Sequence, residues 1–185
     1  MSILELFIIS TGVAMDAFAV SICKGISLNK INIKNILKIG LYFSIFQGLM
    51  PLLGYFIGLN FHHFIESIDH YVVFIILSVL GINMIRESFE NEELDDKLDI
   101  KTMLILSVAT SIDAFALGIS LSLLEVNIFI TVLFIFLVTL VLSLIGVIIG
   151  NKFRGKFGKY SLIFGGVILI LMGIKILIEH IFLGG

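Results

Sequence analysis

The stretch Ser10–Val20 reads STGVAMDAFAV and places Asp16 in the middle of an otherwise apolar run. The four residues DAFA at Asp16–Ala19 occur again at Asp113–Ala116, within the stretch TSIDAFALGIS at Thr110–Ser120. A charged side chain at the centre of a bilayer costs about 2.5 kcal/mol or more. Two such residues in matching surroundings therefore indicate a function, because helix packing does not require them.

The composition of the 185-residue chain is that of an integral membrane protein. Hydrophobic residues make up 59% of the chain, charged residues only 14%, and the mean hydropathy is +1.17. Soluble domains carry about 25% charged residues. Continuous apolar runs, each long enough to cross the hydrocarbon core, favour transmembrane helices over the alternating strands of a barrel. The predicted spans are Ile3–Cys23, Ile36–Leu59, Tyr71–Phe89, Thr102–Leu124, Ile128–Gly150 and Ser161–Phe182.

The basic residues predict how these six spans are oriented. All but one of the twelve Lys and Arg residues flank the first, third and fifth connections between spans. The positive-inside rule makes these connections cytoplasmic, so both termini are expected outside. The exception, Lys175, lies within the sixth span. The first span has no positive n-region and is interrupted by Asp16, so we expect a retained helix rather than a cleaved signal peptide.

The two halves of the sequence resemble each other beyond the repeated DAFA sequence. GYFIG at Gly54–Gly58 matches GVIIG at Gly146–Gly150, and GINMIRE at Gly81–Glu87 matches GIKILIE at Gly173–Glu179. Each copy contains three spans, an odd number, so the second copy enters the membrane from the opposite side. This arrangement is typical of secondary transporters.

The predicted fold is therefore an all-α membrane protein with six transmembrane helices in two inverted-topology three-helix repeats. Residues 1–90 form the first repeat, residues 91–101 an acidic cytoplasmic linker and residues 102–185 the second repeat, within one membrane domain.

The two aspartates are the predicted metal site. Asp16 and Asp113 lie about halfway along their helices, and carboxylates that meet in a low dielectric repel unless a proton or a cation lies between them. Carboxylates are hard oxygen ligands, which suit Mg²⁺, Ca²⁺ or Mn²⁺. Protons that replace the departing metal would couple transport to a proton gradient. A supporting shell is predicted from other polar residues within the spans: Gln47, Asn83, Ser111, Ser120, Thr139 and Lys175.

Several properties stay open at this stage. Lys175 could neutralise an aspartate, or it could bond Glu179 one turn away. The residues define only a hard divalent cation as substrate, and they leave homo-oligomer formation undecided. No basic run with interleaved aromatic residues indicates a nucleic-acid partner.

The chain resembles the bacterial manganese efflux pumps of the MntP type along its whole length. The resemblance is carried by MDAFAVSICKG, TSIDAFALGIS, PLLGYFIG and the six-span layout. It implies a multi-pass plasma-membrane exporter, with Mn²⁺ as the transported substrate, no cofactor, and Asp16 and Asp113 as essential site residues. The family often has a serine where this chain has Ala14, a carboxylate in some members at Gln47, and often a neutral residue at Lys175. These departures concern metal preference.

Two other functions compete with transport. Intramembrane aspartyl proteases also pair two carboxyl groups, but one of theirs lies in a GxGD word that neither Asp16 nor Asp113 provides. A structural or developmental membrane protein of the same fold is the other alternative. Loss of metal tolerance on deletion would distinguish an exporter from it.

Overall fold

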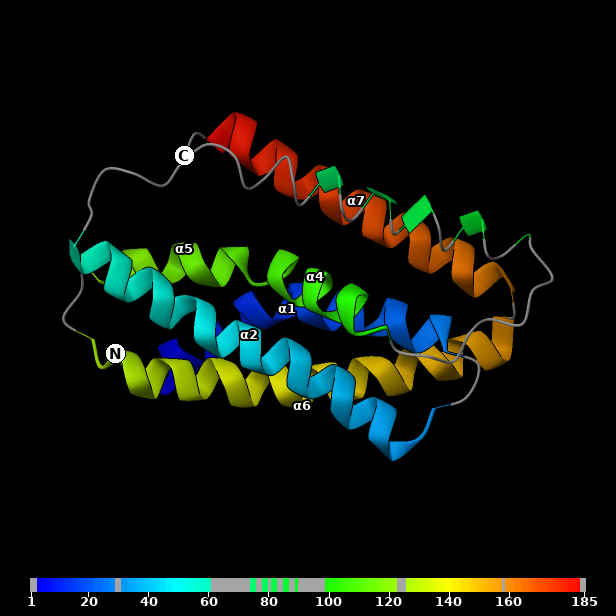
Figure 1. Cartoon of the computed structure of the whole chain (residues 1–185), viewed down its shortest axis with the longest axis horizontal. Helices are drawn as coiled ribbons and strands as arrows, with labels where there is room; N and C mark the ends of the chain where they lie inside the picture. Colours follow the sequence, from blue (N-terminus) through cyan, green and yellow to red (C-terminus); the bar gives the residue numbers. More distant parts are fainter. Residues whose placement is uncertain are drawn as a thin grey trace.

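The computed structural model describes an entirely helical arrangement (Figure 1). Within the described residues the helices are α1 (Ile3–Ser27), α2 (Ile33–Asn60), α4 (Ile100–Ala109), α5 (Ile112–Leu121), α6 (Ile128–Phe157) and α7 (Lys159–Leu183). The described residues are 3–28, 31–60, 99–122, 126–157 and 159–183, and the helical positions 74, 75, 78, 79, 81, 82, 85, 86 and 89 of the predicted third span.

Long apolar helices confirm that the chain is a multi-pass membrane protein. Ile3–Ser27, Ile33–Leu59 and Ile128–Lys156 are each long and apolar enough to cross a membrane, and they contain the predicted first, second and fifth spans. The predicted sixth span lies in α7, where Leu162–Leu171 is a shorter apolar stretch. Most of the predicted third span, Tyr71–Phe89, falls outside the described residues, so the count of six stays a prediction.

Three of these helices begin at side chains that accept hydrogen bonds from the first turn. Asn32 Oδ1 accepts from the Asn35 N–H at 2.7 Å, and Asp99 Oδ2 accepts from the Thr102 N–H at 3.0 Å. Asn127 Oδ1 accepts more weakly from an N–H in the first turn of α6. Asn and Asp favour such positions because a helix leaves its first N–H groups without partners.

Helices α1 and α6 pack along a seam of glycines. A Cβ added at Gly146 would lie 2.9 Å from the Phe18 carbonyl oxygen, and one added at Gly150 would collide with the Ile22 carbonyl oxygen. Any larger residue would therefore push the two backbones apart. We call this contact the α1–α6 seam.

Helices α2 and α5 pack along a second seam of the same kind. A Cβ at Gly54 would collide with the Phe115 carbonyl oxygen, and one at Gly58 would lie 3.1 Å from the Ile119 Cα. These are the residues that the alignment of the two halves matches with those of the α1–α6 seam. In the α1–α6 seam these matched glycines come from the second half of the chain, and in the second contact, which we call the α2–α5 seam, they come from the first half.

The order of these contacts fixes the directions of the helices. Residues further along α1 contact residues further along α6, and the same holds for α2 and α5, so each seam joins parallel helices. Helices α2 and α6 are antiparallel, because Gly40 lies against Leu144 and Gly48 against Phe136. It follows that α1 and α5 run in opposite directions.

Helix α7 lies beside α1 and beside the described part of the third span. The Cys23 thiol of α1 donates to the Gly165 carbonyl oxygen at 3.4 Å. A Cβ at Gly81 would lie 2.7 Å from the Ile170 side chain, so the third span and α7 also approach closely at glycine. Figure 1 shows the described pieces of residues 74–89 running along α7.

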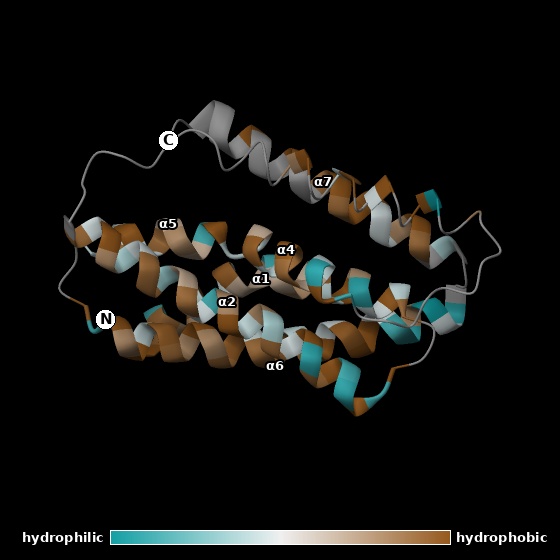
Figure 2. Ribbon diagram, in the orientation of Figure 1, coloured by the Kyte–Doolittle hydropathy of each residue, from teal (hydrophilic) through white to brown (hydrophobic). Residues whose placement is uncertain are grey.

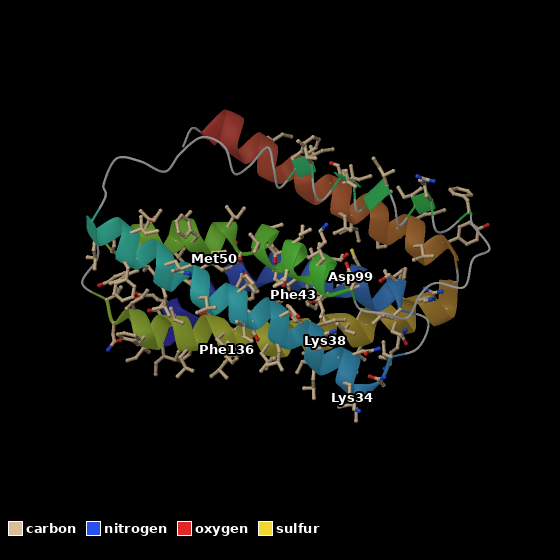
Figure 3. All side chains as sticks on the ribbon, viewed as in Figure 1. Lys34, Lys38, Phe43, Met50, Asp99 and Phe136 are labelled. Atoms are coloured by element: carbon tan, nitrogen blue, oxygen red, sulfur yellow. The ribbon has the colours of Figure 1, made fainter. Side chains whose placement is uncertain are left out.

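Hydrophilic residues are most frequent toward one end of the bundle (Figure 2). Figure 3 places Lys34 and Lys38 of α2 at this end, with Asp99 before α4. Here Arg154 of α6 donates to the Ile26 carbonyl oxygen at 2.9 Å, which places a positive charge at the last turn of α1. This is the end that the sequence predicts to be cytoplasmic.

Candidate metal-transport site

The two predicted site aspartates lie in different local structures. Asp16 is partly buried in the interior of the unbroken helix α1, whereas Asp113 is exposed in the first turn of α5. The N–H groups of a first helical turn favour a nearby negative charge. The two carboxylates therefore differ in their position relative to a helix N-terminus.

The fourth span is broken immediately before Asp113, a feature that the prediction of one helix over Thr102–Leu124 did not include. Helices α4 and α5 meet at an angle of 41°. At the junction the Thr110 hydroxyl donates to the Leu106 carbonyl oxygen at 3.0 Å, and the Ser111 hydroxyl donates to the Ser107 carbonyl oxygen at 2.7 Å. Such bonds from hydroxyl side chains to the preceding turn bend helices. The corresponding residues of α1 are Val13 and Ala14, which carry no hydroxyl.

Both aspartates lie on the side of their helix that faces away from the glycine seams. Gly25, which packs on the backbone of α6, is about two and a half turns beyond Asp16 and so on the opposite face of α1. Ser122, which packs on Gly58, has the same relation to Asp113. The structure therefore gives the two carboxylates equivalent placements relative to the two seams.

The face of α1 that carries Asp16 leads toward α7. Cys23, about two turns beyond Asp16 on the same face, contacts Gly165 of α7. Gly12, about one turn before Asp16, has no heavy atom within 4 Å of a Cβ built there. The face of α1 that carries Asp16 is thus contacted by α7 at Cys23.

The register of the helices separates the two aspartates along the bundle axis. A hydrogen bond from Gln47 to Val13 links α2 and α1, and the α2–α5 seam places the Thr110 region near the level of Gln47. Asp16 lies about one turn beyond Val13, and Asp113 about one turn beyond Thr110 in the opposite direction. Two helical turns correspond to on the order of 10 Å. A cation shared by both carboxylates stays a prediction.

Gln47 is fully buried and uses only one end of its amide. Its Nε2 donates to the Val13 carbonyl oxygen at 2.6 Å, while its Oε1 has no hydrogen-bond partner. The amide thus connects α2 to α1 and presents a free acceptor oxygen inside the bundle. This arrangement is compatible with the supporting role predicted for Gln47, which no contact in the structure tests.

Buried side-chain oxygen atoms that have no hydrogen-bond partner among the described residues occur on several helices. Five side chains on α1, α2, α4 and α6 are 0% exposed and carry such an oxygen. Unpaired buried polar atoms are unusual in folded proteins. The five residues are Ser10, Gln47, Ser107, Thr139 and Ser143.

The sequence identified only some of these five residues. Gln47 and Thr139 were predicted, and the alignment of the two halves matches them with each other. Ser10, Ser107 and Ser143 were missed. Ser10 and Ser107 begin the repeated S-x5-D-A-F-A word, so their repetition was the signal that could have identified them.

Two of the other predicted shell residues, Ser111 and Ser120, are described with their side chains. The Ser111 hydroxyl bonds the preceding turn, and Ser120 is exposed on α5, where its hydroxyl donates to the Ala116 carbonyl oxygen. Asn83 lies outside the described residues, and only the backbone of Lys175, in α7, is described. The supporting role predicted for these four residues therefore stays a prediction.

In the part of the chain that the structure describes, no group of three or more His, Cys, Asp or Glu side chains could hold a metal ion. A cation held there would need oxygen from hydroxyl, amide or carbonyl groups, or from water, besides one carboxylate. Hard divalent cations accept all of these ligands.

Long apolar helices, glycine seams and a polar interior with two intramembrane carboxylates define a class of protein, the polytopic membrane transporters. Comparison with known proteins identifies the group within this class. Residues 30–177 match the family model described as "Putative manganese efflux pump". The chain belongs to this family, which confirms the resemblance inferred from the sequence. It is a family of transporters, not of enzymes.

Curated relatives agree over almost the full length. The chain is 48% identical over 185 residues to a putative manganese efflux pump MntP of Campylobacter jejuni (strain 81-176), with 98% of this chain and 99% of the relative covered. It is 49% identical to one of Desulfitobacterium hafniense (98% and 97% covered) and 44% identical to one of Mannheimia succiniciproducens (100% of both covered). No solved structure matches the chain.

Proposed function

We propose that this protein exports Mn²⁺ across the bacterial plasma membrane as a secondary transporter, with Asp16 and Asp113 as the anionic groups that bind the cation in transit. The proposal rests on membership of a family described as manganese efflux pumps. It also rests on one structural observation: the two motif aspartates occupy equivalent positions, opposite equivalent glycine seams, on helices that run in opposite directions.

This observation supports two inverted three-helix repeats, residues 1–90 and 102–185, joined by the linker 91–101. Exchange between two conformations follows naturally from such symmetry, because each repeat can adopt the arrangement of the other. The bent fourth span and the straight first span are then the two forms that one element takes in the two repeats. We propose alternating access on this basis, with both termini outside.

The chemistry of the aspartates supports export of a divalent cation coupled to protons. A carboxylate within a membrane is costly as an anion, so it favours a bound cation or a proton. A cation that leaves toward the outside would be replaced by protons, which return to the cytoplasm as the site resets. Manganese as the cation follows from the family description, while the oxygen ligands support the hard divalent class.

A manganese-sensitive bacterial strain tests the proposal. Cells expressing the wild-type chain should contain less manganese than cells without it and should tolerate more Mn²⁺ in the medium. Asp16→Asn and Asp113→Asn should each abolish both effects, because an amide keeps the shape of the side chain and removes its charge. Membrane levels of each variant, measured by immunoblot, serve as the control. Protection that survives both substitutions would refute the site.

A second measurement tests proton coupling and orientation. In inverted vesicles, Mn²⁺ uptake by the wild type should collapse when the pH gradient is dissipated. A reporter at the C-terminus should be accessible from outside intact cells. Uptake that is insensitive to the gradient would leave export intact and exclude proton coupling.

A further inference from the structure

We propose that Gln47 and Thr139 are a pair of latches, side chains whose hydrogen bond to another helix forms in only one conformation of the transport cycle. Gln47 holds α2 against α1 in the described conformation. In the other conformation Thr139 holds α6 against the fourth span, by a hydrogen bond to the Thr110 carbonyl oxygen. The inference rests on the proposed alternating access and names two residues that determine the balance between its conformations.

The first latch is formed in the structure. Gln47 is 0% exposed, and its Nε2 donates to the Val13 carbonyl oxygen at 2.6 Å. A carbonyl oxygen has two lone pairs, so Val13 can accept this bond in addition to the one within its own helix. Helix α1 packs mainly on α6 and only slightly on α2. The Gln47 bond therefore contributes much of the connection between α1 and α2.

The second latch has its donor in place. Thr139 is the residue of the second half that the alignment of the two halves matches with Gln47. Its side chain is 0% exposed, and its hydroxyl has no hydrogen-bond partner among the described residues. A buried hydroxyl without a partner is costly, and a threonine in a helix can avoid this cost by bonding the preceding turn, as Thr131 does in α6. The Thr139 hydroxyl is thus available for a bond that this conformation does not make.

The acceptor of the second latch is also in place. Val13 and Thr110 are matched residues, each three positions before the aspartate of its copy. Helix α5 begins at Ile112, and the Phe115 N–H donates to the Ser111 carbonyl oxygen at its start. In the described part of the chain no backbone N–H donates to the Thr110 carbonyl oxygen, because the helix is broken there.

The donor and the acceptor of the second latch lie near one level of the bundle. The register of the α2–α5 seam places Thr110 near the level of Gln47. Gly48 lies against Phe136, and this contact between α2 and α6 places Gln47 near the level of Thr139. Thr110 and Thr139 therefore differ by less than about one helical turn. The second bond needs a sideways approach of α6 and the fourth span, without sliding along the axis.

The helix contacts differ between the halves in the way that two latches require. Helix α2 packs on both α5 and α6 and lies between them (Figure 1). Helix α1 packs on α6 and also contacts α2, whereas α4 and α5 pack on α2 and make no comparable contact with α6 among the described residues. The helices approach each other where the latch is formed and stay apart where it is not. Exchange of the two arrangements between the repeats would break the Gln47 bond and form the Thr139 bond.

Cross-linking in native membranes tests this geometry without Mn²⁺. In a Cys23→Ser background, one variant carries Val13→Cys with Gln47→Cys, and a second carries Thr110→Cys with Thr139→Cys. Dibromobimane is a short, membrane-permeant cross-linker that becomes fluorescent when it joins two thiols. We expect it to link both pairs, because each pair is close in one of the two conformations.

The matched control for the second pair is Thr110→Cys with Thr131→Cys. Thr131 lies about two turns from Thr139 on the same helix, so this pair should not be linked. Linking of the Val13–Gln47 pair alone would overturn the second latch. Equal linking of the control pair would also overturn it, because the reagent would then report general mobility of the helices.

Matched single variants test the balance between the conformations. Gln47→Met removes a donor and Thr139→Val removes a hydroxyl, each with little change in size. Because each variant weakens a different conformation, we expect the KM for Mn²⁺ at the cytoplasmic face, measured by uptake into inverted vesicles, to change about fivefold in opposite directions. The double variant should return toward the wild-type KM. Thr131→Val removes a hydroxyl that bonds within α6, so its KM should stay within about twofold of wild type.

The outcomes separate the latches from the transport function. A KM is independent of the amount of folded protein, so a partial loss of folding would not produce opposite changes. Changes in the same direction, or no change in either single variant, would overturn the latches and leave export standing. Absence of Mn²⁺ uptake by the wild type would refute the proposed function itself.

Discussion

The first span and the fourth span share the sequence DAFA, which begins at their aspartates, and they differ in shape. Helix α1 runs unbroken through Val13 and Ala14, whereas the fourth span breaks into α4 and α5 at Thr110 and Ser111. At the break, two hydroxyl side chains bond back to the preceding turn, and such bonds favour bending of a helix. One aspartate thus lies in mid-helix and the other in a first turn.

The two halves of the chain agree in their glycine seams and differ in the backbone around their aspartates. The glycine contacts are equivalent on both sides, so packing is conserved between the halves while the local backbone at the aspartate is not. In an alternating-access transporter this is the expected place for a difference, because the two repeats adopt different conformations in any one state.

Substitution of the seam glycines should have the largest effect. Gly54→Leu and Gly150→Leu each force a side chain into a backbone carbonyl, which we expect to cost about 3 kcal/mol, the upper end for overpacking. Gly155→Leu is the control, since nothing lies within 4 Å of a Cβ there. The measurement is the melting temperature of the purified protein in detergent. Equal decreases in melting temperature for Gly54→Leu and Gly150→Leu would support the equivalence of the two seams. A decrease for only one of the two variants would contradict it.

Replacing the residues at the α4–α5 junction by those found in α1 should have an intermediate effect. The double variant Thr110→Val, Ser111→Ala copies Val13–Ala14 and removes both back-bonds, so the fourth span should straighten. We expect slower amide hydrogen exchange at residues 108–113 and efflux reduced about tenfold, because the two halves lose their difference. Unchanged exchange with unchanged efflux would show that the hydroxyls do not cause the break.

The helix cap of α4 should have the smallest effect. Hydrogen bonds from Thr102 hold the pKa of the Asp99 carboxyl below its usual value. The cap therefore adds stability above the unfolded-state pKa of about 3.9, and this contribution is lost as the pH falls through the lower folded-state pKa. Asp99→Asn, which keeps an acceptor, should melt near the wild type at pH 7 and lose part of the pH dependence below pH 4. An unchanged slope would contradict the role of the carboxylate.

Much of the fold could be predicted because it depends on local properties. Apolar runs of sufficient length predicted α1 and α2 to within four residues at each end, and they predicted the start of α6, which continues seven residues beyond the predicted end at Gly150. Asn32, Asp99 and Asn127 mark helix starts through their own side chains. The break at Thr110–Ser111 was missed, because a Thr–Ser pair within an apolar run bends a helix only when its hydroxyls bond backward. Among the site residues, Gln47 and Thr139 were identified by polarity alone, whereas Ser10 and Ser143 resembled ordinary small residues of a helix interface.

The sequence by itself determined that the chain lies in a membrane, that its halves correspond and that two aspartates are placed where charge is costly, because each property follows from residue type and spacing. Only the tertiary structure decided which helices meet at the glycines, in which direction they run, and that both aspartates lie on helix faces away from the seams. Those features depend on contacts between residues more than a hundred positions apart, such as Cys23 and Gly165, and no local pattern encodes them.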